Sequence, residues 1–242
     1  MNVFNEGNAN STSRGGIVAQ LTPDLFRFLE DLKANNDRSW FKSNQARFEA
    51  DVREPLLAFI AAFEEPLAAI SPSMLAIAKK SGGSMFRIYR DTRFSKDKSP
   101  YKNWAAIQFR HEAGRDAHAP CYYLHLAPGD VFVGAGIWHP DGPALDAIRR
   151  LIDESPENWV KAREAVFRAG WELEGDALKR IPRGFDAEHP LADDLRRKDF
   201  IAVRRLSEED VLQPGFLERY TDLCREPVDL MVFLTSALGL PF

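Results

Sequence analysis

The sequence predicts one α+β domain with a largely antiparallel central sheet. Apolar residues at helical spacing fill the first part of the chain and return at its end, whereas short strand-like runs bounded by turn residues lie between them. A doubly wound parallel sheet would require strands that alternate with helices, and that alternation is missing. Because no internal repeat or long linker divides the chain, residues 21–242 are expected to form a single domain. The Asn-, Ser- and Gly-rich residues 1–20 are expected to be a disordered tail.

Helix signals begin at Thr22-Pro23, which supplies a capping hydroxyl and a proline for the first helical position. A second helix is expected from about Asp37. Pro55 should kink or restart it, because proline lacks the N–H that continues the hydrogen-bond pattern. Later helices are expected after Asp141, from Pro156, over Leu191–Arg197, after a capping box at Ser207, and over Gly215–Leu238 with a bend at Pro227.

The strand candidates are short apolar runs bounded by turn-forming residues, and Pro128-Gly129-Asp130 joins two of them as a hairpin. Along the second strand of that hairpin, Gly134 and Gly136 fall on one face. The missing side chains leave room for a helix or a ligand to approach closely. Trp171–Leu178 is a weak strand or a loop. The expected sheet consists of Leu75–Lys79, Met85–Arg90, Trp104–Arg110, Cys121–Ala127, Val131–Trp138 and Phe200–Leu206.

The charge of the chain is unevenly distributed. The formal net charge is −4, but residues 79–115 contain ten Lys and Arg against three Asp and Glu, a local charge of +7. A basic island on an acidic body concentrates positive potential locally. Its centre is Phe86–Lys102, where cations lie among aromatic rings and only Asp91 and Asp97 are acidic. The cations of this stretch are Arg87, Arg90, Arg93, Lys96, Lys98 and Lys102.

Three separated stretches together resemble a known family. They are Asn35–Phe41 (NNDRSWF), Phe86–Lys102 and Gly134–Pro140 (GAGIWHP), and they occur in the expected order. From about Thr22 to the C-terminus the chain is similar to domain-of-unknown-function family 2461, which is bacterial and fungal. The family has no assigned reaction. The resemblance therefore implies that the three stretches belong together, and it adds no mechanism.

The favoured hypothesis is a soluble protein with a pocket for a phosphate or carboxylate ligand, held by the six cations of the basic stretch. Arginine binds such groups through a planar fork, and lysine adds a point charge. Whether the protein is an enzyme stays open. In one alternative the same loop grips a nucleic-acid backbone, with Tyr101 or Trp104 stacking on bases, although the acidic remainder of the chain would repel it. In another, the loop forms internal ion pairs or a partner interface and binds no ligand.

Candidates for catalysis are weaker. They are Asp91 in the basic loop, Tyr101 after it, His125 within a strand, and His139 at a strand end, where functional groups are often found. The chain lacks metal-binding spacings, a nucleophile elbow, a phosphate-binding loop and a dinucleotide fingerprint, so no metal or cofactor is expected. Side chains that could support the site are Asn36, Arg38, Trp40 and Trp138.

Cys121 and Cys224 lie far apart in apolar contexts, as expected of free buried thiols in a reducing compartment, although the sequence does not exclude a disulfide. No apolar run approaches the roughly 20 residues of a membrane span. The polar residues 1–16 lack the apolar segment of a signal peptide. The sequence therefore predicts a cytoplasmic protein without membrane contact.

Overall fold

The computed structural model describes residues 20–114 and 119–242. Nearly all of the expected N-terminal tail therefore lies outside the described residues. Within the described ranges the strands form one six-stranded antiparallel sheet, and helices precede, separate and follow them in the chain, which confirms the α+β fold. The sheet order is β1-β2-β3-β4-β6-β5, with β1 Met74–Leu75, β2 Ala105–His111, β3 Cys121–Ala127, β4 Asp130–Ile137, β5 Glu172–Glu174 and β6 Phe200–Leu206.

The N-terminal helices begin where caps and prolines indicate. The Asp37 carboxylate accepts the backbone N–H groups of Ser39 and Trp40 and so caps α2. Pro55 lies in the first turn of α4, directly after a π-helical segment, so the chain restarts there as expected. The elements are α1 Pro23–Ala34, α2 Arg38–Ser43, α3 Gln45–Arg47, the π-helix η1 Phe48–Arg53, α4 Glu54–Ala62 and α5 Glu64–Ile70.

The C-terminal helices are shorter than the sequence predicts. The single helix expected over Gly215–Leu238 is divided in two, because Pro227 stands between the parts and caps the second. The helix expected over Leu191–Arg197 has only four residues. The capping box of Ser207 and Asp210 is present as predicted. The elements are α6 Gly142–Glu154, α7 Pro156–Arg168, α8 Ala192–Leu195, α9 Glu208–Leu212, α10 Phe216–Arg225 and α11 Val228–Ala237.

One predicted strand, Met85–Arg90, is wrong. The chain makes two hydrogen bonds with β2, from Phe86 N to Ala106 O (2.9 Å) and from Gln108 N to Ser84 O (2.8 Å), and then leaves the sheet. From there it pairs with its own return, where Arg90 N donates to the carbonyl oxygen of Pro100 at 2.9 Å. The segment is therefore a two-stranded arm that stands on the edge of β2.

Four further strand predictions change in extent. The strand expected over Leu75–Lys79 is only the two residues of β1, because the chain turns at Ile77, whose oxygen accepts the N–H of Ser84 at 2.8 Å. The stretch Trp171–Leu178 supplies the sixth strand, β5. Trp104–Arg110 and Val131–Trp138 are each displaced by one residue, whereas β3 and β6 have the predicted bounds.

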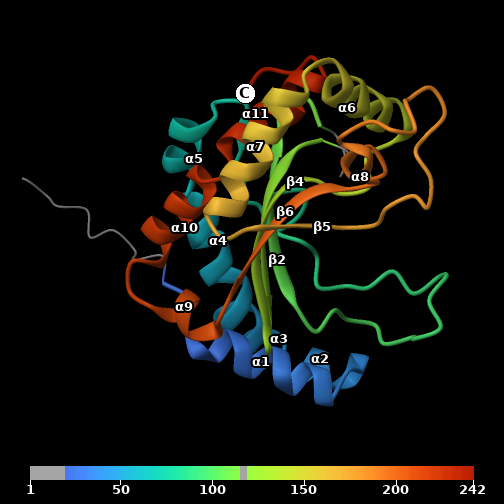
Figure 1. Cartoon of the computed structure of the whole chain (residues 1–242). Helices are drawn as coiled ribbons and strands as arrows, with labels where there is room; N and C mark the ends of the chain where they lie inside the picture. Colours follow the sequence, from blue (N-terminus) through green and yellow to red (C-terminus); the bar gives the residue numbers. More distant parts are fainter. Residues whose placement is uncertain (1–19, 115–118) are drawn as a thin grey trace, which may run out of the picture.

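Helices cover one face of the sheet and leave the opposite face open (Figure 1). Helices α4, α5, α7, α10 and α11 lie on the covered side, where alternate strand residues such as Leu124 and Val133 are fully buried. Burial of such a side chain contributes about 1.5–3 kcal/mol, so the covered face fixes the register of the strands. Tyr123 and His125 consequently point to the open face.

No helix within the described ranges has both the length and the apolarity that a membrane crossing demands.

Candidate cleft on the open face of the sheet

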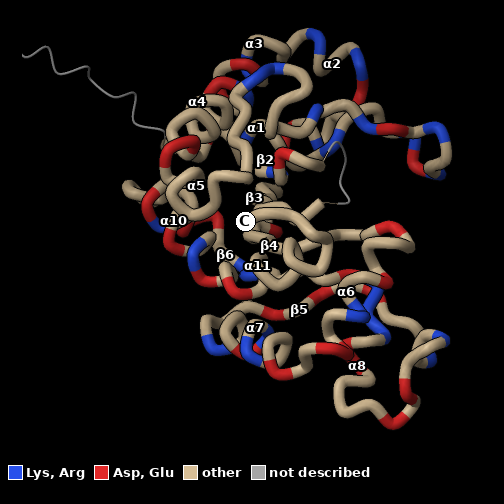
Figure 2. Tube along the Cα trace, turned by 90° about the horizontal axis from the view of Figure 1, so that it is seen from above, with Lys and Arg blue, Asp and Glu red and all other residues tan. Residues whose placement is uncertain are grey.

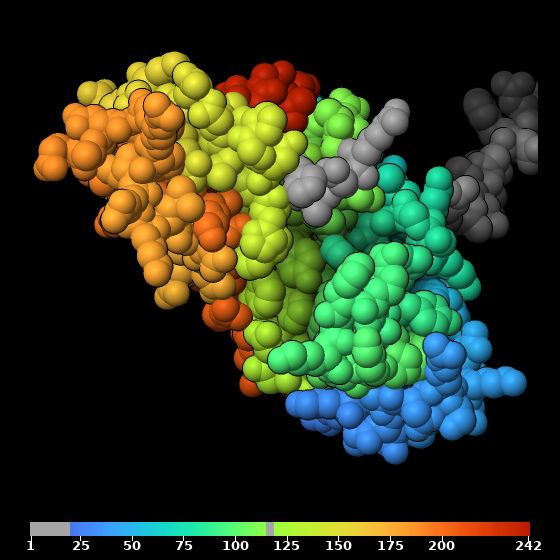
Figure 3. All heavy atoms as spheres, turned by 90° about the vertical axis from the view of Figure 1, so that its right-hand side faces the viewer, coloured from blue at the N-terminus to red at the C-terminus, as the bar shows by residue number. Residues whose placement is uncertain are grey.

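The open face of the sheet is the bottom of a cleft (Figure 3). One wall is the segment between β1 and β2, and the other includes the segment between β5 and β6. Gly134 and Gly136 share this face, as predicted, and lie opposite Tyr123 and Cys121 of β3. At Gly134 the room left by the missing side chain is taken by Ile201, whose Cδ1 would lie 3.3 Å from an added Cβ, and at Gly136 the backbone of β6 approaches closely.

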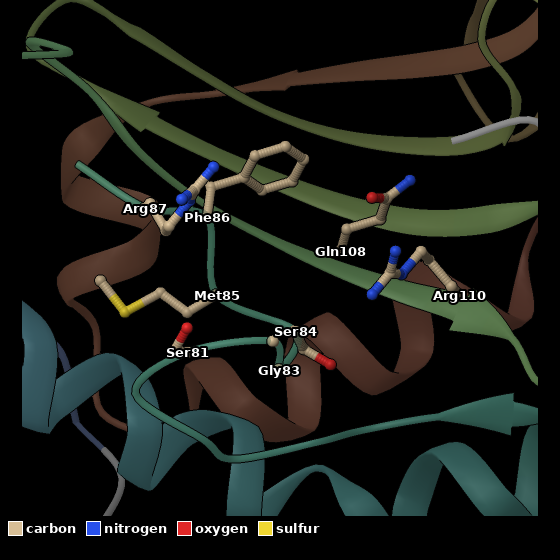
Figure 4. A pocket seen from close by; sticks show the side chains of 9 residues that line it. Ser81, Gly83, Ser84, Met85, Phe86, Arg87, Gln108 and Arg110 are labelled. Atoms are coloured by element: carbon tan, nitrogen blue, oxygen red, sulfur yellow. The ribbon is translucent and has the colours of Figure 1, made fainter. Parts of the chain in front are cut away.

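A basic cavity of about 350 Å³ lies where the first wall meets the floor (Figure 4). It is lined by residues 81–87 of the wall and by Gln108 and Arg110 of β2. Ser84 fixes the wall, because its buried hydroxyl accepts the N–H of Ile77 at 2.9 Å while its carbonyl oxygen accepts from Gln108 N. In Figure 4, Arg87 lies at one end of the cavity and Arg110 at the other.

The cavity is positively charged, and no carboxylate from residues 20–114 or 119–242 lines it. Its lining includes the guanidinium groups of Arg87 and Arg110 but no Asp or Glu. Neither arginine forms an ion pair with any residue in the described part of the chain. Two unpaired guanidinium groups around one concavity repel each other, so an anion that settles between them would be bound favourably.

Lys102 adds a third positive charge beside the cavity. Its Nζ donates to the carbonyl oxygen of Arg87 at 2.9 Å and lies over the rings of Phe86 and Trp104, 5.2 and 4.7 Å from their centroids. Burial lowers the pKa of Lys102, and the nearby charge of Arg87 lowers it further. The ammonium group is thus held by rings and a carbonyl, and the cavity keeps its positive charge.

The other four cations of the basic stretch lie away from this cavity. Arg90 pairs with Asp97, and Arg93 pairs with Asp91 at 2.7 Å. The hydrogen bond from the Arg93 side chain is the main reason that the pKa of Asp91 falls to about 2. Figure 2 shows the same mixture of signs around the outside of the molecule. Lys96 is exposed, and Lys98 donates its Nζ to the oxygen of Thr92 at 2.9 Å.

A second cavity, of about 610 Å³, brings together several predicted residues. Arg90, Lys98 and Tyr101 of the arm line it together with Asn36 and Arg38. Asn36 clamps the arm to the helices, because its amide donates to Tyr101 O at 3.0 Å and accepts from Tyr101 N at 3.1 Å. Asn36 therefore holds the arm against the junction of α1 and α2.

The aromatic residues near this second cavity are mostly structural. The Tyr101 ring is buried and stacks on Phe41 with 4.1 Å between centroids, and burial raises its pKa. Trp40 packs against Phe28 at 5.8 Å. Tyr101 nevertheless remains part of the lining of the second cavity.

The two histidine candidates have different surroundings. His125 lies on the cleft floor, where its Nδ1 is 3.0 Å from the hydroxyl of Tyr123 and burial lowers its pKa. His139 follows β4, where its Nδ1 lies 2.9 Å from the buried carboxylate of Asp199. The exposed ring of Trp138 lies 4.7 Å from that of His139.

Sequence reasoning missed Arg110, Gln108 and Asp199. Arg110 ends a predicted strand, and strand alternation places it on the same face as Gln108, which is a usable signal. Asp199 directly precedes β6, but its burial depends on contacts with Asp176 and His139, from distant parts of the chain. No local sequence pattern predicts that Asp199 is buried.

Fold and cleft together define an α+β protein whose antiparallel sheet is covered on one face and carries a basic cavity on the other. Residues 24–233 match the model of a family described as "Conserved hypothetical protein (DUF2461)", and the chain belongs to that family. The resemblance noted from the three motifs is thereby confirmed. A comparison with curated proteins gives no match.

Proposed function

We propose that the chain binds a small anionic ligand, a phosphate or carboxylate compound, in the cavity of Figure 4. The observation that supports this most directly is the pair Arg87 and Arg110, which share one cavity to which the described part of the chain contributes no carboxylate. Gln108 supplies an amide and Ser81 a hydroxyl to complete the hydrogen bonds of such a group. The six cations of the basic stretch thus divide into two that act here, Arg87 and Lys102, and four that lie outside.

The outer part of the arm favours a different role. Its pairs Arg90–Asp97 and Arg93–Asp91 match the alternative in which the basic loop neutralises itself and supports the fold or a partner contact. Nucleic-acid binding is less well supported, because Arg90 and Arg93 of the arm are paired with carboxylates and Trp104 is engaged with Lys102. If the protein bound a single-stranded oligonucleotide and the affinity fell steeply with salt, that result would support the nucleic-acid-binding alternative.

Titration calorimetry with inorganic phosphate, pyrophosphate and citrate at low ionic strength tests the proposal. Arg110→Gln should weaken binding of the preferred anion by about 10–100-fold, because a charge-assisted hydrogen bond is lost. Arg93→Gln is the matched control, since Arg93 belongs to the same arm but pairs with Asp91 outside the cavity. Equal affinities in wild type and Arg110→Gln, or no binding by wild type, would overturn the proposal.

We also propose that the protein acts in the cytoplasm. The support is that both cysteines are free and buried, the usual state of thiols in a reducing compartment.

A further inference from the structure

The two arginines of the basic cavity are separated along β2. Phe86 N donates to Ala106 O and the chain then leaves the sheet, so Arg87 lies about five residues from Arg110 along the strand. At roughly 3.4 Å per residue, the two backbone positions are about 17 Å apart. In Figure 4 the ring of Phe86 and the amide of Gln108 lie between the two guanidinium groups. A group bound by one arginine is therefore separated from the other arginine by these two side chains.

The cavity is also larger than a single anionic group. Its volume is about 350 Å³. A water molecule occupies about 30 Å³ in the liquid, and a carboxylate or phosphate group is only a few times larger. Apart from the two arginines, the described residues that line the cavity are uncharged, and the side chains of Met85 and Phe86 are apolar and partly buried. The middle of the cavity therefore suits a short apolar chain.

Each end of the cavity needs a negative charge of its own. No carboxylate from residues 20–114 or 119–242 lines the cavity at Arg87 or at Arg110. The Arg87 end also has Lys102 beside it, whose Nζ donates to the carbonyl oxygen of Arg87. A ligand with one anionic group neutralises one guanidinium and leaves the other without a counter-charge. A ligand with two such groups at the right distance neutralises both.

We propose that the ligand of the basic cavity is an elongated compound with an anionic group, carboxylate or phosphate, at each end of an apolar chain. This inference rests on the proposed function, because it specifies the ligand of the same cavity. One anionic group binds Arg87, the other binds Arg110, and the chain between them contacts Phe86. Once the first end is bound, the second binds at a high effective concentration, which is greatest when the chain length matches the separation of the two arginines.

The test measures affinity against chain length by NMR titration of nitrogen-15-labelled protein at constant ionic strength. The probes are succinate, adipate, suberate and sebacate, each compared with the monocarboxylate of equal length, and the side-chain amide of Gln108 reports binding in the cavity. Affinity should pass through a maximum at one chain length. There the diacid should bind about 10–100-fold more tightly than the monoacid, because a second charge-assisted interaction forms. Bisphosphate esters of the matching diols form a second arm, and the tighter arm identifies the anionic group.

Two variants remove one end of the site each. Arg87→Gln and Arg110→Gln should both reduce the affinity for the diacid to that for its monoacid. The affinity for the monoacid should change less, since one arginine still holds a single carboxylate. Arg93→Gln should match wild type, because Arg93 pairs with Asp91 outside the cavity. Unchanged amide positions away from the cavity show that each variant is folded.

The outcomes separate this inference from the proposed function. In both arms, a flat dependence on chain length, equal affinities for compounds with one and two anionic groups, or a loss of affinity in only one of the two variants overturns the inference. The proposed function survives those results if a single anion still binds and depends on Arg110. If no carboxylate or phosphate compound shifts the Gln108 signals, the inference and the proposed function both fail.

Discussion

At the scale of single residues, the arm shows how a neighbouring arginine shifts the pKa of a carboxyl group. Asp91 accepts both the side chain and the backbone N–H of Arg93, and these bonds stabilise its carboxylate form. Its pKa is therefore lowered from 3.8 to about 2. A group whose pKa is lower in the folded state stabilises the fold above its unfolded pKa and loses that effect as pH falls.

Arg93→Gln should raise the pKa of Asp91 from about 2 towards 3.8, because the side-chain hydrogen bond is its largest cause. The value should stay below 3.8, since the backbone bond is kept. The stabilisation by Asp91 is present above pH 3.8 and disappears between pH 3.8 and about 2. Carbon-detected NMR titration of the carboxyl group measures this. Asp97, whose pKa is lowered first by Ser99, serves as the internal control. A wild-type Asp91 that titrates near 3.8 would contradict the pairing.

At the scale of elements, the arm of residues 84–102 is attached to the rest of the molecule at two places. Its base bonds to β2, and its far strand bonds to the α1–α2 junction through Asn36. The arm carries Arg87 and Lys102, so its attachment holds one side of the basic cavity in place.

Asn36→Ala should destabilise the protein by about 1–3 kcal/mol, because it removes both bonds to Tyr101 and leaves a buried N–H without its acceptor. Urea unfolding measures the loss, and hydrogen exchange should show faster exchange of the Tyr101 amide. Asn35→Ala is the matched control, since the Asn35 side chain is exposed and donates to the backbone oxygen of Asp31 in the preceding helix rather than to the arm. Its cost should stay within about 0.5 kcal/mol. Equal midpoints for the two variants would count against the clamp.

The elements also show how far sequence reasoning reaches. Strands β3 and β6 were predictable because alternating residues become buried on one face, and that period is visible in the sequence. Met85–Arg90 has the same alternation, yet after the bond from Phe86 N to Ala106 O its hydrogen bonds lie within the arm, where Arg90 N donates to Pro100 O and Ile88 O accepts from Lys102 N. The basic stretch was predictable as a feature, but its division into paired and unpaired cations depends on which carboxylates fold back onto it, which composition does not reveal.

At the scale of the whole molecule, the fold separates stability from binding. The helix-covered face contains the hydrophobic core, whereas the open face carries the cleft and its basic cavity. A ligand in the cleft binds only the folded state, because arm and floor meet only there, so binding should stabilise the whole domain.

The anion preferred in calorimetry should therefore raise the melting temperature. At 100 times its Kd the stabilisation is about 2.7 kcal/mol, which corresponds to roughly 5–10 °C for a domain of this size. Differential scanning fluorimetry at constant ionic strength, with sodium chloride replacing the anion as control, measures the shift. Arg110→Gln should remove most of it. A shift that is the same in Arg110→Gln as in wild type would mean that the anion acts elsewhere.

The sheet also ends in a way that protects the molecule from its own copies. Its two outermost strands, β1 and β5, are only two and three residues long. An exposed edge strand can pair with a strand of another chain through its unpaired N–H and C=O groups. Edge strands as short as these two offer too few such groups for stable pairing. A protein with a large uncovered sheet surface can therefore stay dispersed at high concentration, since growth into fibrils through strand addition has almost no template to start from.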